Sequence, residues 1–438
     1  MERSVAMLAL SLTLPVAAAQ TPDEGARVAR LPELHLTLTL PPLENLASPG
    51  SNRWRGQLGS SQVEIALKTL KNEKYGFVEP EEVLDIGPSF WSNTDQGRND
   101  PGARHAISGS FGYAGYAAWE RTELRAKDGV APAGVRFLLG GLLPDSGYWI
   151  TLEAKPSPSA EHEALLAEFL TKGIAYDGPV REHRWTDEEA RARWERDAPV
   201  LSRDKLGPLT RTAHYIVLTD SPGGPAFGRR MEECFAAVRK AFPFDEVDGR
   251  RLLPVFLFQT SAEYREFYER SLGVDDEGGS KGLASRDYYA TWNEVIGDPV
   301  HLHEATHQIF RQRLGLGGGG DWFQEGVAGY VTSKPAERAA VAAAFKKQAP
   351  VPLAELVRTQ SVPCSTAALG GDRAGQAALV IEFLRESKWA KDRFPAFLQR
   401  VGRIPDRNHA EVEDALAEVY GVDLAGLEER WVEYLKKR

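Results

Sequence analysis

The stretch DPVHLHEATHQIFRQR, residues 298–313, decides more about the fold than any other part of this chain. Its pattern predicts a helix, with Asp298 as N-cap, Pro299 at the first helical position and an end near Arg313, before a glycine-rich run. His303 and His307 stand four residues apart, and four residues turn a helix through about 400°. Their imidazoles therefore project to nearly the same side and can hold one metal ion.

A second stretch, DWFQEG at residues 321–326, supplies the rest of a metal site. Asp321 is expected to cap this helix, and the glycines at 317–320 are expected to form a flexible loop before it. Folding the second helix back on the first brings Glu325, eighteen positions past His307, to the metal as a third ligand.

Glu304 is rotated about 100° from His303, so it flanks the metal instead of binding it. A zinc site with three protein ligands keeps a position for water, whose proton a neighbouring carboxylate can take. The residues thus predict one Zn²⁺ ion held by His303, His307 and Glu325, with Glu304 as general base.

Other residues near these stretches are expected to have structural roles. His301 lies two positions before His303 and points about 200° away, which favours a hydrogen-bonded or solvent-facing histidine over a ligand. Trp322 and Phe323 are expected in the core. The remaining candidates show no ligand spacing and are expected at the surface: His105, His162, His183 and His409.

The sequence HEATH with the downstream WFQEGVAGY resembles the gluzincin branch of the zincins, which includes thermolysin and the aminopeptidase N type. More narrowly, residues 206–438 resemble the exported bacterial "peptidase MA-like" group. The resemblance implies zinc on His303, His307 and Glu325, catalysis by Glu304, and a peptide or protein substrate lying along an edge strand within residues 283–293. It also implies a donor to the oxyanion, for which the candidates are Tyr288, Tyr289 and Tyr330, although a packing role is expected for any one of them.

The length of the chain and its N-terminal sequence predict that these stretches belong to a larger, exported protein. At 438 residues the chain is expected to hold two domains and a leader. Residues 1–19 have the layout of a signal peptide, with an apolar segment too short to span a bilayer and small residues at its end. A buried N-terminal segment is the alternative. We expect a periplasmic or extracellular protein without a stable membrane anchor, and the net charge of −9 argues against a nucleic-acid partner.

The predicted fold class is α+β. Residues 20–30 are expected to be flexible, and residues 31–180 to form a strand-rich accessory domain, with strands at 35–40, 62–70, 135–139 and 148–153, a helix at 161–172 and loops at 89–115. A helical linker is expected at 181–205. Residues 206–438 are expected to form a zincin-like domain with a small sheet, the helices of the site and a helical C-terminal part.

Alternatives stay open for the pairing of the two cysteines and for the catalytic activity of the protein. Cys234 and Cys364 can form a disulfide after export or remain buried thiols. The chain is predicted to be a zinc-dependent peptidase. The alternatives are a gluzincin-fold binding or scaffold protein of the cell envelope with little catalysis, and a zinc hydrolase of a non-peptide amide or ester. The sequence does not indicate an oligomeric state.

Overall fold

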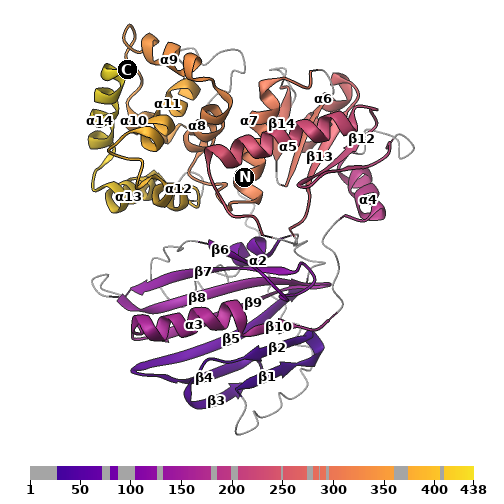
Figure 1. The fold of residues 1–438 in the computed structure, drawn as a ribbon, viewed down its shortest axis with the longest axis vertical. Coiled ribbons are helices and arrows are strands. Elements are labelled where there is room, and N and C mark those ends of the chain that lie inside the picture. Colours follow the sequence, from indigo (N-terminus) through magenta and orange to yellow (C-terminus); the bar gives the residue numbers. More distant parts are fainter. Residues whose placement is uncertain are drawn as a thin grey trace, which may run out of the picture. The chain divides into compact units, whose positions relative to one another are not determined.

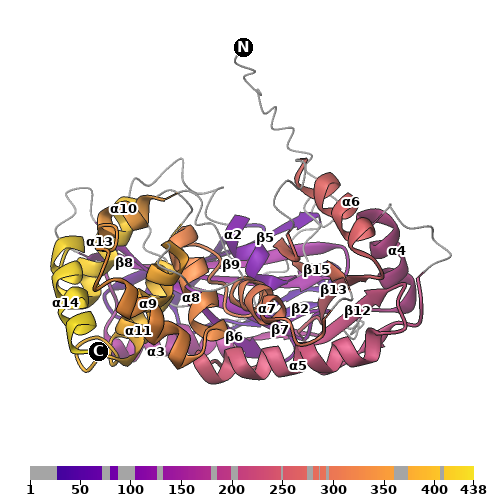
Figure 2. The same ribbon diagram turned by 90° about the horizontal axis from the view of Figure 1, so that it is seen from above.

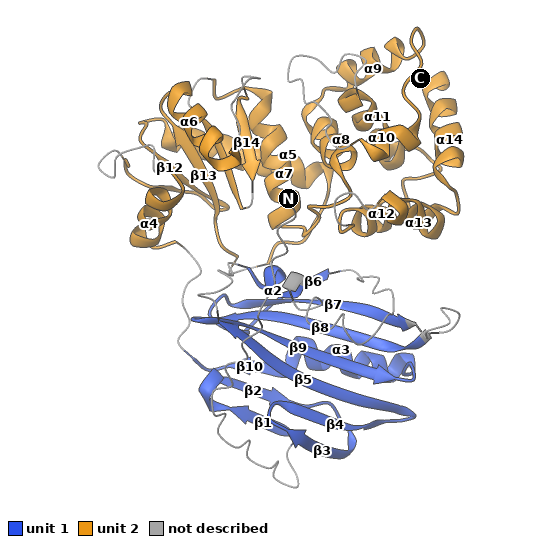
Figure 3. Ribbon diagram, turned by 180° about the vertical axis from the view of Figure 1, so that it is seen from behind, with its two compact units in different colours: residues 1–182 blue, residues 183–438 orange. Residues whose placement is uncertain are grey.

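The computed structural model describes residues 27–71, 79–86, 104–125, 132–178, 185–198, 206–247, 250–273, 280–285, 287–292, 295–359, 373–404 and 409–438. The protein is mixed α+β and divides into two compact units, residues 1–182 and 183–438 (Figures 1 and 3). The expected signal peptide and residues 20–26 lie outside the described ranges. None of the helices in those ranges has the length and apolar character needed to cross a membrane.

A seven-stranded antiparallel sheet is the largest element of unit 1. Its strand order is β3 (Glu44–Gly50), β4 (Arg53–Leu58), β5 (Ser61–Lys71), β9 (Ser146–Lys155), β8 (Pro132–Leu143), β7 (Tyr116–Arg125) and β6 (Arg104–Ser108). The strands predicted at 62–70, 135–139 and 148–153 are confirmed. The prediction of loops at 89–115 is wrong at β6, which is stabilised by pairing with β7, the next strand in the chain. Residues 89–103 lie outside the described ranges.

The other described elements of unit 1 are a smaller sheet, one 3-10 helix and two α-helices. The elements are β1 (Val28–Leu31), η1 (Pro32–Leu34), β2 (Leu36–Thr39), α2 (Pro80–Ile86), α3 (Ala160–Lys172) and β10 (Ile174–Tyr176). Residues 20–30 were predicted to be flexible, but β1 begins within this segment. Pairing with β2 holds β1 in the sheet. The predicted helix at 161–172 is α3, which buries Leu166, Phe169 and Leu170. α2 packs closely on β8 at Gly140, where a Cβ would lie 2.7 Å from the carbonyl oxygen of Pro80.

Unit 2 contains a five-stranded sheet in the order β11 (Thr210–Arg211), β12 (Tyr215–Thr219), β13 (Leu253–Phe258), β15 (Tyr288–Trp292) and β14 (Gly282–Ser285). β12, β13 and β15 are parallel. Parallel neighbours require crossover connections, and here α5 (Gly224–Ala241) and α6 (Ser261–Leu272) lie in these connections. Residues 283–293, predicted as one strand, contain parts of both β14 and β15. Of these two strands, only β14 lies at an edge of the sheet.

Helices cover both faces of this sheet. Alternate strand residues, such as Val217 and Val255, share a core with α5 and with α7 (Pro299–Gln312). Their neighbours Ile216 and Phe256 face a second core, which includes Trp194 of α4 (Asp187–Asp197). We predicted α4 as part of a linker, but it belongs to unit 2 because Trp194 is fully buried against the sheet.

The remainder of unit 2 is helical and lies beside the sheet (Figures 1 and 2). Its helices are α8 (Asp321–Thr332), α9 (Pro335–Ala344), α10 (Leu353–Arg358), α11 (Arg373–Glu386), α12 (Phe394–Val401), α13 (His409–Tyr420) and α14 (Leu424–Lys437). α11 is buried over most of its length and packs on α8. A Cβ at Gly326 of α8 would lie 2.9 Å from Ile381 Cγ1 of α11, so the glycine permits this close approach.

Candidate metal centre

Helix α7 carries both histidines of the predicted site. The Asp298 side chain accepts a hydrogen bond from the backbone N–H of Val300, as expected for the N-cap, and Pro299 begins the helix. One turn separates His303 from His307, and their Nε2 atoms lie 3.1 Å apart. The local spacing therefore brings two ring nitrogens together, as predicted from the sequence.

The turn before α8 directs that helix back toward α7. The N–H groups of Gly318 and Gly319 donate to the carbonyls of Gly402 and Ile404 at 2.7 and 2.8 Å. Gly319 and Gly320 have φ values of 89° and 83°, a backbone region that favours glycine. The expectation of a flexible loop is thus wrong here, because distant carbonyls bind the turn. The cap of α8 is Gly320, and Asp321 is instead the first helical residue.

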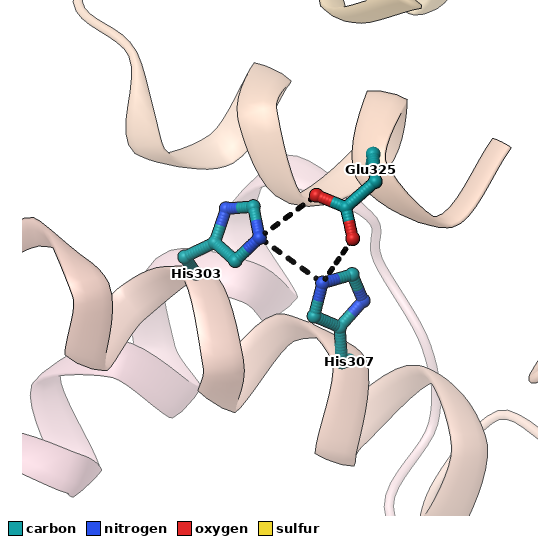
Figure 4. Close-up of side chains that lie close together, drawn as sticks. All are labelled: His303, His307 and Glu325. Atoms are coloured by element: carbon teal, nitrogen blue, oxygen red, sulfur yellow. Dashed lines mark hydrogen bonds and ion pairs between the residues drawn. The ribbon is translucent and has the colours of Figure 1, made fainter. Parts of the chain in front are cut away.

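Glu325 of α8 meets the two histidines of α7 (Figure 4). Its Oε2 lies 3.1 Å from His303 Nε2, and its Oε1 lies 3.4 Å from His307 Nε2. One ligand atom from each of the three residues lies within 4.8 Å of the other two. The imidazole side chains are 7% and 13% exposed and the carboxylate is 19% exposed, so the cluster is largely buried but partly accessible to solvent.

The donor set fits a zinc ion. Although Glu325 Oε2 is buried within ion-pair distance of His303, it accepts no hydrogen bond from the residues that the structure describes. The two Nε2 atoms face each other, and a neutral imidazole has only one N–H to donate. A cation between the three side chains would satisfy these atoms together, and two histidines with a glutamate are a known ligand set for catalytic zinc.

The electrostatics of Glu325 agree with a ligand role. Burial acts to raise the pKa of this carboxyl, but the close approach of His303 and His307 lowers it further than burial raises it. The net pKa lies well below the usual range of a glutamate. Glu325 is therefore ionised at neutral pH, as a metal ligand must be.

Glu304 lies against the edge strand of the sheet. Its Oε2 accepts a hydrogen bond of 2.8 Å from the backbone N–H of Ala284 in β14. Burial raises the pKa of Glu304, although the nearby His303 and His307 act in the opposite direction. A raised pKa brings a carboxylate closer to the range in which it exchanges protons near neutral pH. This contact could not be predicted from the residue pattern, because Ala284 contributes only its backbone.

The three tyrosines considered as oxyanion donors all have other partners. The hydroxyl of Tyr289 lies 2.7 Å from Nδ1 of His301 in the core. Tyr288 projects to the opposite face of the sheet and packs on Phe256. The Tyr330 hydroxyl donates to Glu386 at 2.7 Å and accepts from Arg385. These contacts give each tyrosine a structural role, and the donor role implied by the resemblance stays a prediction.

The other histidines that the structure describes do not join the cluster. His301 is buried, with Nδ1 against the Tyr289 hydroxyl and Nε2 2.9 Å from the carbonyl oxygen of Val295, so it is a hydrogen-bonded core histidine. His105 is exposed, whereas His162 and His409 are half-buried, and His183 lies outside the described ranges. The expected core positions of Trp322 and Phe323 are confirmed.

Cysteine chemistry does not add a second centre in the described part of the chain. Cys234 is a buried thiol whose pKa burial raises to about 11, so it is protonated at neutral pH and suits core packing. Cys364 lies outside the described ranges, so the alternatives of a disulfide and two thiols stay as stated.

Comparison with known proteins adds little to this geometry. No protein-family model matches the sequence, and no curated protein is similar to it. Solved structures that match do so only distantly, and two serve as examples. One, from Bacteroides thetaiotaomicron, is 8% identical, with 63% of this chain and 74% of that chain covered and a TM-score of 0.22. The other, a mutant of an M1 zinc metallopeptidase from Deinococcus radiodurans, is 11% identical, with 88% and 91% covered and a TM-score of 0.28. At these scores the likenesses do not establish a shared fold.

Proposed function

We propose that this protein is a zinc-dependent peptidase of the gluzincin type, with a zincin-like catalytic region in unit 2. The observation that carries the proposal is the convergence of His303, His307 and Glu325 from two helices, with Glu304 beside them. The short distances among these side chains support the ligand set and the general base that the sequence predicts. The proposed cofactor is one Zn²⁺ ion.

The proposed reaction is hydrolysis of a peptide bond by water. When bound, zinc would polarise the scissile carbonyl and bring the pKa of a bound water toward neutrality. Glu304 accepts a proton from the attacking water on its carboxylate and passes it to the leaving nitrogen. Its raised pKa supports this exchange, because the protonated form becomes accessible nearer to neutral pH. The Ala284 N–H orients the carboxylate while it acts.

The edge strand β14 supports a peptide substrate. Ala284 pairs with Tyr289 across the hairpin, but its N–H points to Glu304 instead of to β15. In an antiparallel ladder, a residue that does not bond to its partner directs both its N–H and its C=O to the other side. The Ala284 carbonyl thus faces away from β15, and an extended peptide can bond to such an edge. We assign the substrate-binding edge to β14 alone.

We also propose that the protein acts outside the cytoplasm, in the periplasm or extracellular space, on a peptide or protein substrate. The signal-like residues 1–19 support export, and the charge of −9 supports the absence of a nucleic-acid partner.

The substitution Glu304→Gln tests the proposed reaction. It keeps the shape of the side chain and removes its ability to take a proton, so zinc content should stay at one ion while peptide hydrolysis falls by about 10²–10⁴-fold. Metal analysis and a peptide-library digest measure the two outcomes. Hydrolysis at the wild-type rate would overturn the role of Glu304. Zinc binding without zinc-dependent cleavage of any peptide would favour a scaffold protein or a hydrolase of another amide or ester.

A further inference from the structure

Gln308 of α7 connects the active-site helix to the sheet. It follows His307 and is 2% exposed. Its Nε2 donates to the Pro254 carbonyl of β13 at 3.0 Å and to the Asp287 carbonyl, between β14 and β15, at 2.9 Å. The side-chain amide of Gln308 therefore fixes α7 both to the central strand β13 and to the hairpin of β14 and β15, in which β14 is the edge strand.

Asp287 uses its carboxylate for a second connection. Both oxygens accept hydrogen bonds from Arg193 of α4, at 2.9 and 2.6 Å. The two side chains are only 7% and 13% exposed. Burial acts to raise the pKa of Asp287, but Arg193 lowers it overall and keeps the carboxylate charged. Asp287 thus connects the hairpin to α7 through its backbone carbonyl and to α4 through its carboxylate.

The hairpin in turn covers the proposed general base. Ala284 of β14 donates its N–H to Glu304, and a Cβ at Gly282 would lie 3.1 Å from Glu304 Cγ. A shift of β14 would therefore move both the hydrogen bond and the surface against which Glu304 rests. The same strand presents the Ala284 carbonyl to a substrate.

We propose that Gln308 and the Arg193–Asp287 pair are positioning residues that hold β14 in register over Glu304. This inference rests on the proposed function for what Glu304 does. A buried ion pair adds little net stability compared with apolar residues of similar volume, so stability alone does not explain these polar side chains. These side chains instead contribute hydrogen bonds of fixed direction, which set the position of β14 relative to Glu304.

Gln308→Met tests the connection, with Gln376→Met as its matched control. Gln376 of α11 is 1% exposed and also holds a distant backbone segment, because it bonds to the N–H and the carbonyl of Val351. Amide hydrogen exchange of the zinc-loaded protein is followed by mass spectrometry in peptides covering residues 281–285. Steady-state kinetics on a cleaved peptide then give kcat and KM separately.

We expect exchange in residues 281–285 to quicken roughly tenfold in Gln308→Met and to stay unchanged in Gln376→Met. The kcat of Gln308→Met should fall by on the order of 10–100-fold, with zinc content intact, because small misplacements of reacting groups are costly. Gln376→Met should keep its kcat within about twofold, even where both variants lose similar stability.

Two results would overturn the inference: unchanged exchange in Gln308→Met, or faster exchange with normal kcat. If Gln308→Met does not fold, Asp287→Asn gives the same readouts, because it weakens the pair with Arg193 and keeps the carbonyl that Gln308 binds. A wild-type protein that cleaves no peptide would remove the proposed function, and hydrogen exchange would still decide whether these residues hold β14.

Discussion

The two halves of the metal centre are held in place in different ways. His303 and His307 lie one turn apart on α7, so helix geometry alone sets the distance between them. Glu325 reaches them only because a turn of glycines reverses the chain and because α8 packs closely on α11. The histidine half depends on local structure, and the glutamate half depends on tertiary packing.

This difference has a consequence for stability and metal binding. Disturbing the helices beneath α8 should weaken zinc binding, since it moves one ligand relative to the other two. Disturbing the local structure of α7 should cost folding stability but leave the spacing of the two histidines unchanged. A ligand that binds only the folded state also stabilises it, so zinc should reinforce the contact between the two halves.

Glu382 is a buried charge that supports the glutamate half. It is fully buried in α11 and pairs with Arg338 and Arg438, and it also accepts a hydrogen bond of 3.0 Å from Tyr434. Arg338 in turn donates to the carbonyls of Tyr330 and Ser333 at the end of α8. The cluster thus ties α11 to the helix that carries Glu325.

Glu382→Gln should cost about 3–5 kcal/mol of unfolding free energy, because it leaves the buried Arg338 without its counter-charge. Chemical denaturation measures the loss. The control is Glu386→Gln on the same helix, whose side chain is 40% exposed and which should cost about 0–1 kcal/mol. Equal losses in the two variants would show that the buried cluster does not support the glutamate half.

Gly326→Ala probes the packing of α8 on α11 directly. The new Cβ would lie 2.9 Å from Ile381 Cγ1 and 3.0 Å from the Ala377 carbonyl oxygen, so the helices must separate. We expect a loss of about 1–3 kcal/mol in stability and roughly tenfold weaker zinc binding, measured by competition with a chelator. Gly329→Ala is milder, with 3.1 Å to Ala378 Cβ, and should have a smaller effect on both. Unchanged zinc affinity in Gly326→Ala would contradict the dependence of Glu325 on packing.

The same contrast explains what the sequence could predict. The four-residue spacing and the Asp298 cap are local features, so helix α7 and the positions of His303 and His307 followed from general rules. The meeting of Glu325 with the histidines was also predicted, but the hydrogen-bonded turn before α8 was expected to be flexible. Its partners, the carbonyls of Gly402 and Ile404, lie about 80 residues away in the sequence.

Strands that are held by pairing with the neighbouring strand of a hairpin were the hardest to predict. Residues 283–293 were predicted as one strand although the chain turns between Ser285 and Tyr288, and β6 was missed because it is stabilised by pairing with β7. The role of Ala284 could not be predicted at all, because it contributes a backbone N–H that any residue except proline carries.

Asp298→Ala tests the local half. The variant removes the N-cap of α7 and should cost about 1 kcal/mol of stability, while zinc affinity stays within about twofold of wild type. Thr260→Ala removes an equivalent cap from α6, where the side chain accepts from the Glu263 N–H, and should cost a similar amount. A loss of zinc affinity in Asp298→Ala alone would mean that the histidine half is not set by helix geometry.

The smallest expected effect concerns pH and lies outside both halves, at His214 before β12. Its ring nitrogens lie 2.6 Å from Glu232 and 3.0 Å from Glu246, and the ring stacks on Phe235. Burial acts to lower the pKa of His214, but the hydrogen bonds to the two carboxylates raise it overall. Protonation is therefore favoured in the folded state over the unfolded chain.

A group whose pKa rises on folding stabilises the protein fully below its unfolded pKa, here about 6.5, and loses that contribution as pH rises through the folded value. Wild type should therefore exceed His214→Gln in unfolding free energy most at pH 5.5 to 6, with the gap narrowing above neutrality. Denaturation curves across this range measure the gap. Zinc affinity of the two proteins at pH 7.5 should be equal, because His214 touches neither α7 nor α8 in the contacts described for it. If the difference in unfolding free energy instead increased with pH, the pKa of His214 would be lowered on folding. His214 would then not stabilise the sheet through its protonation.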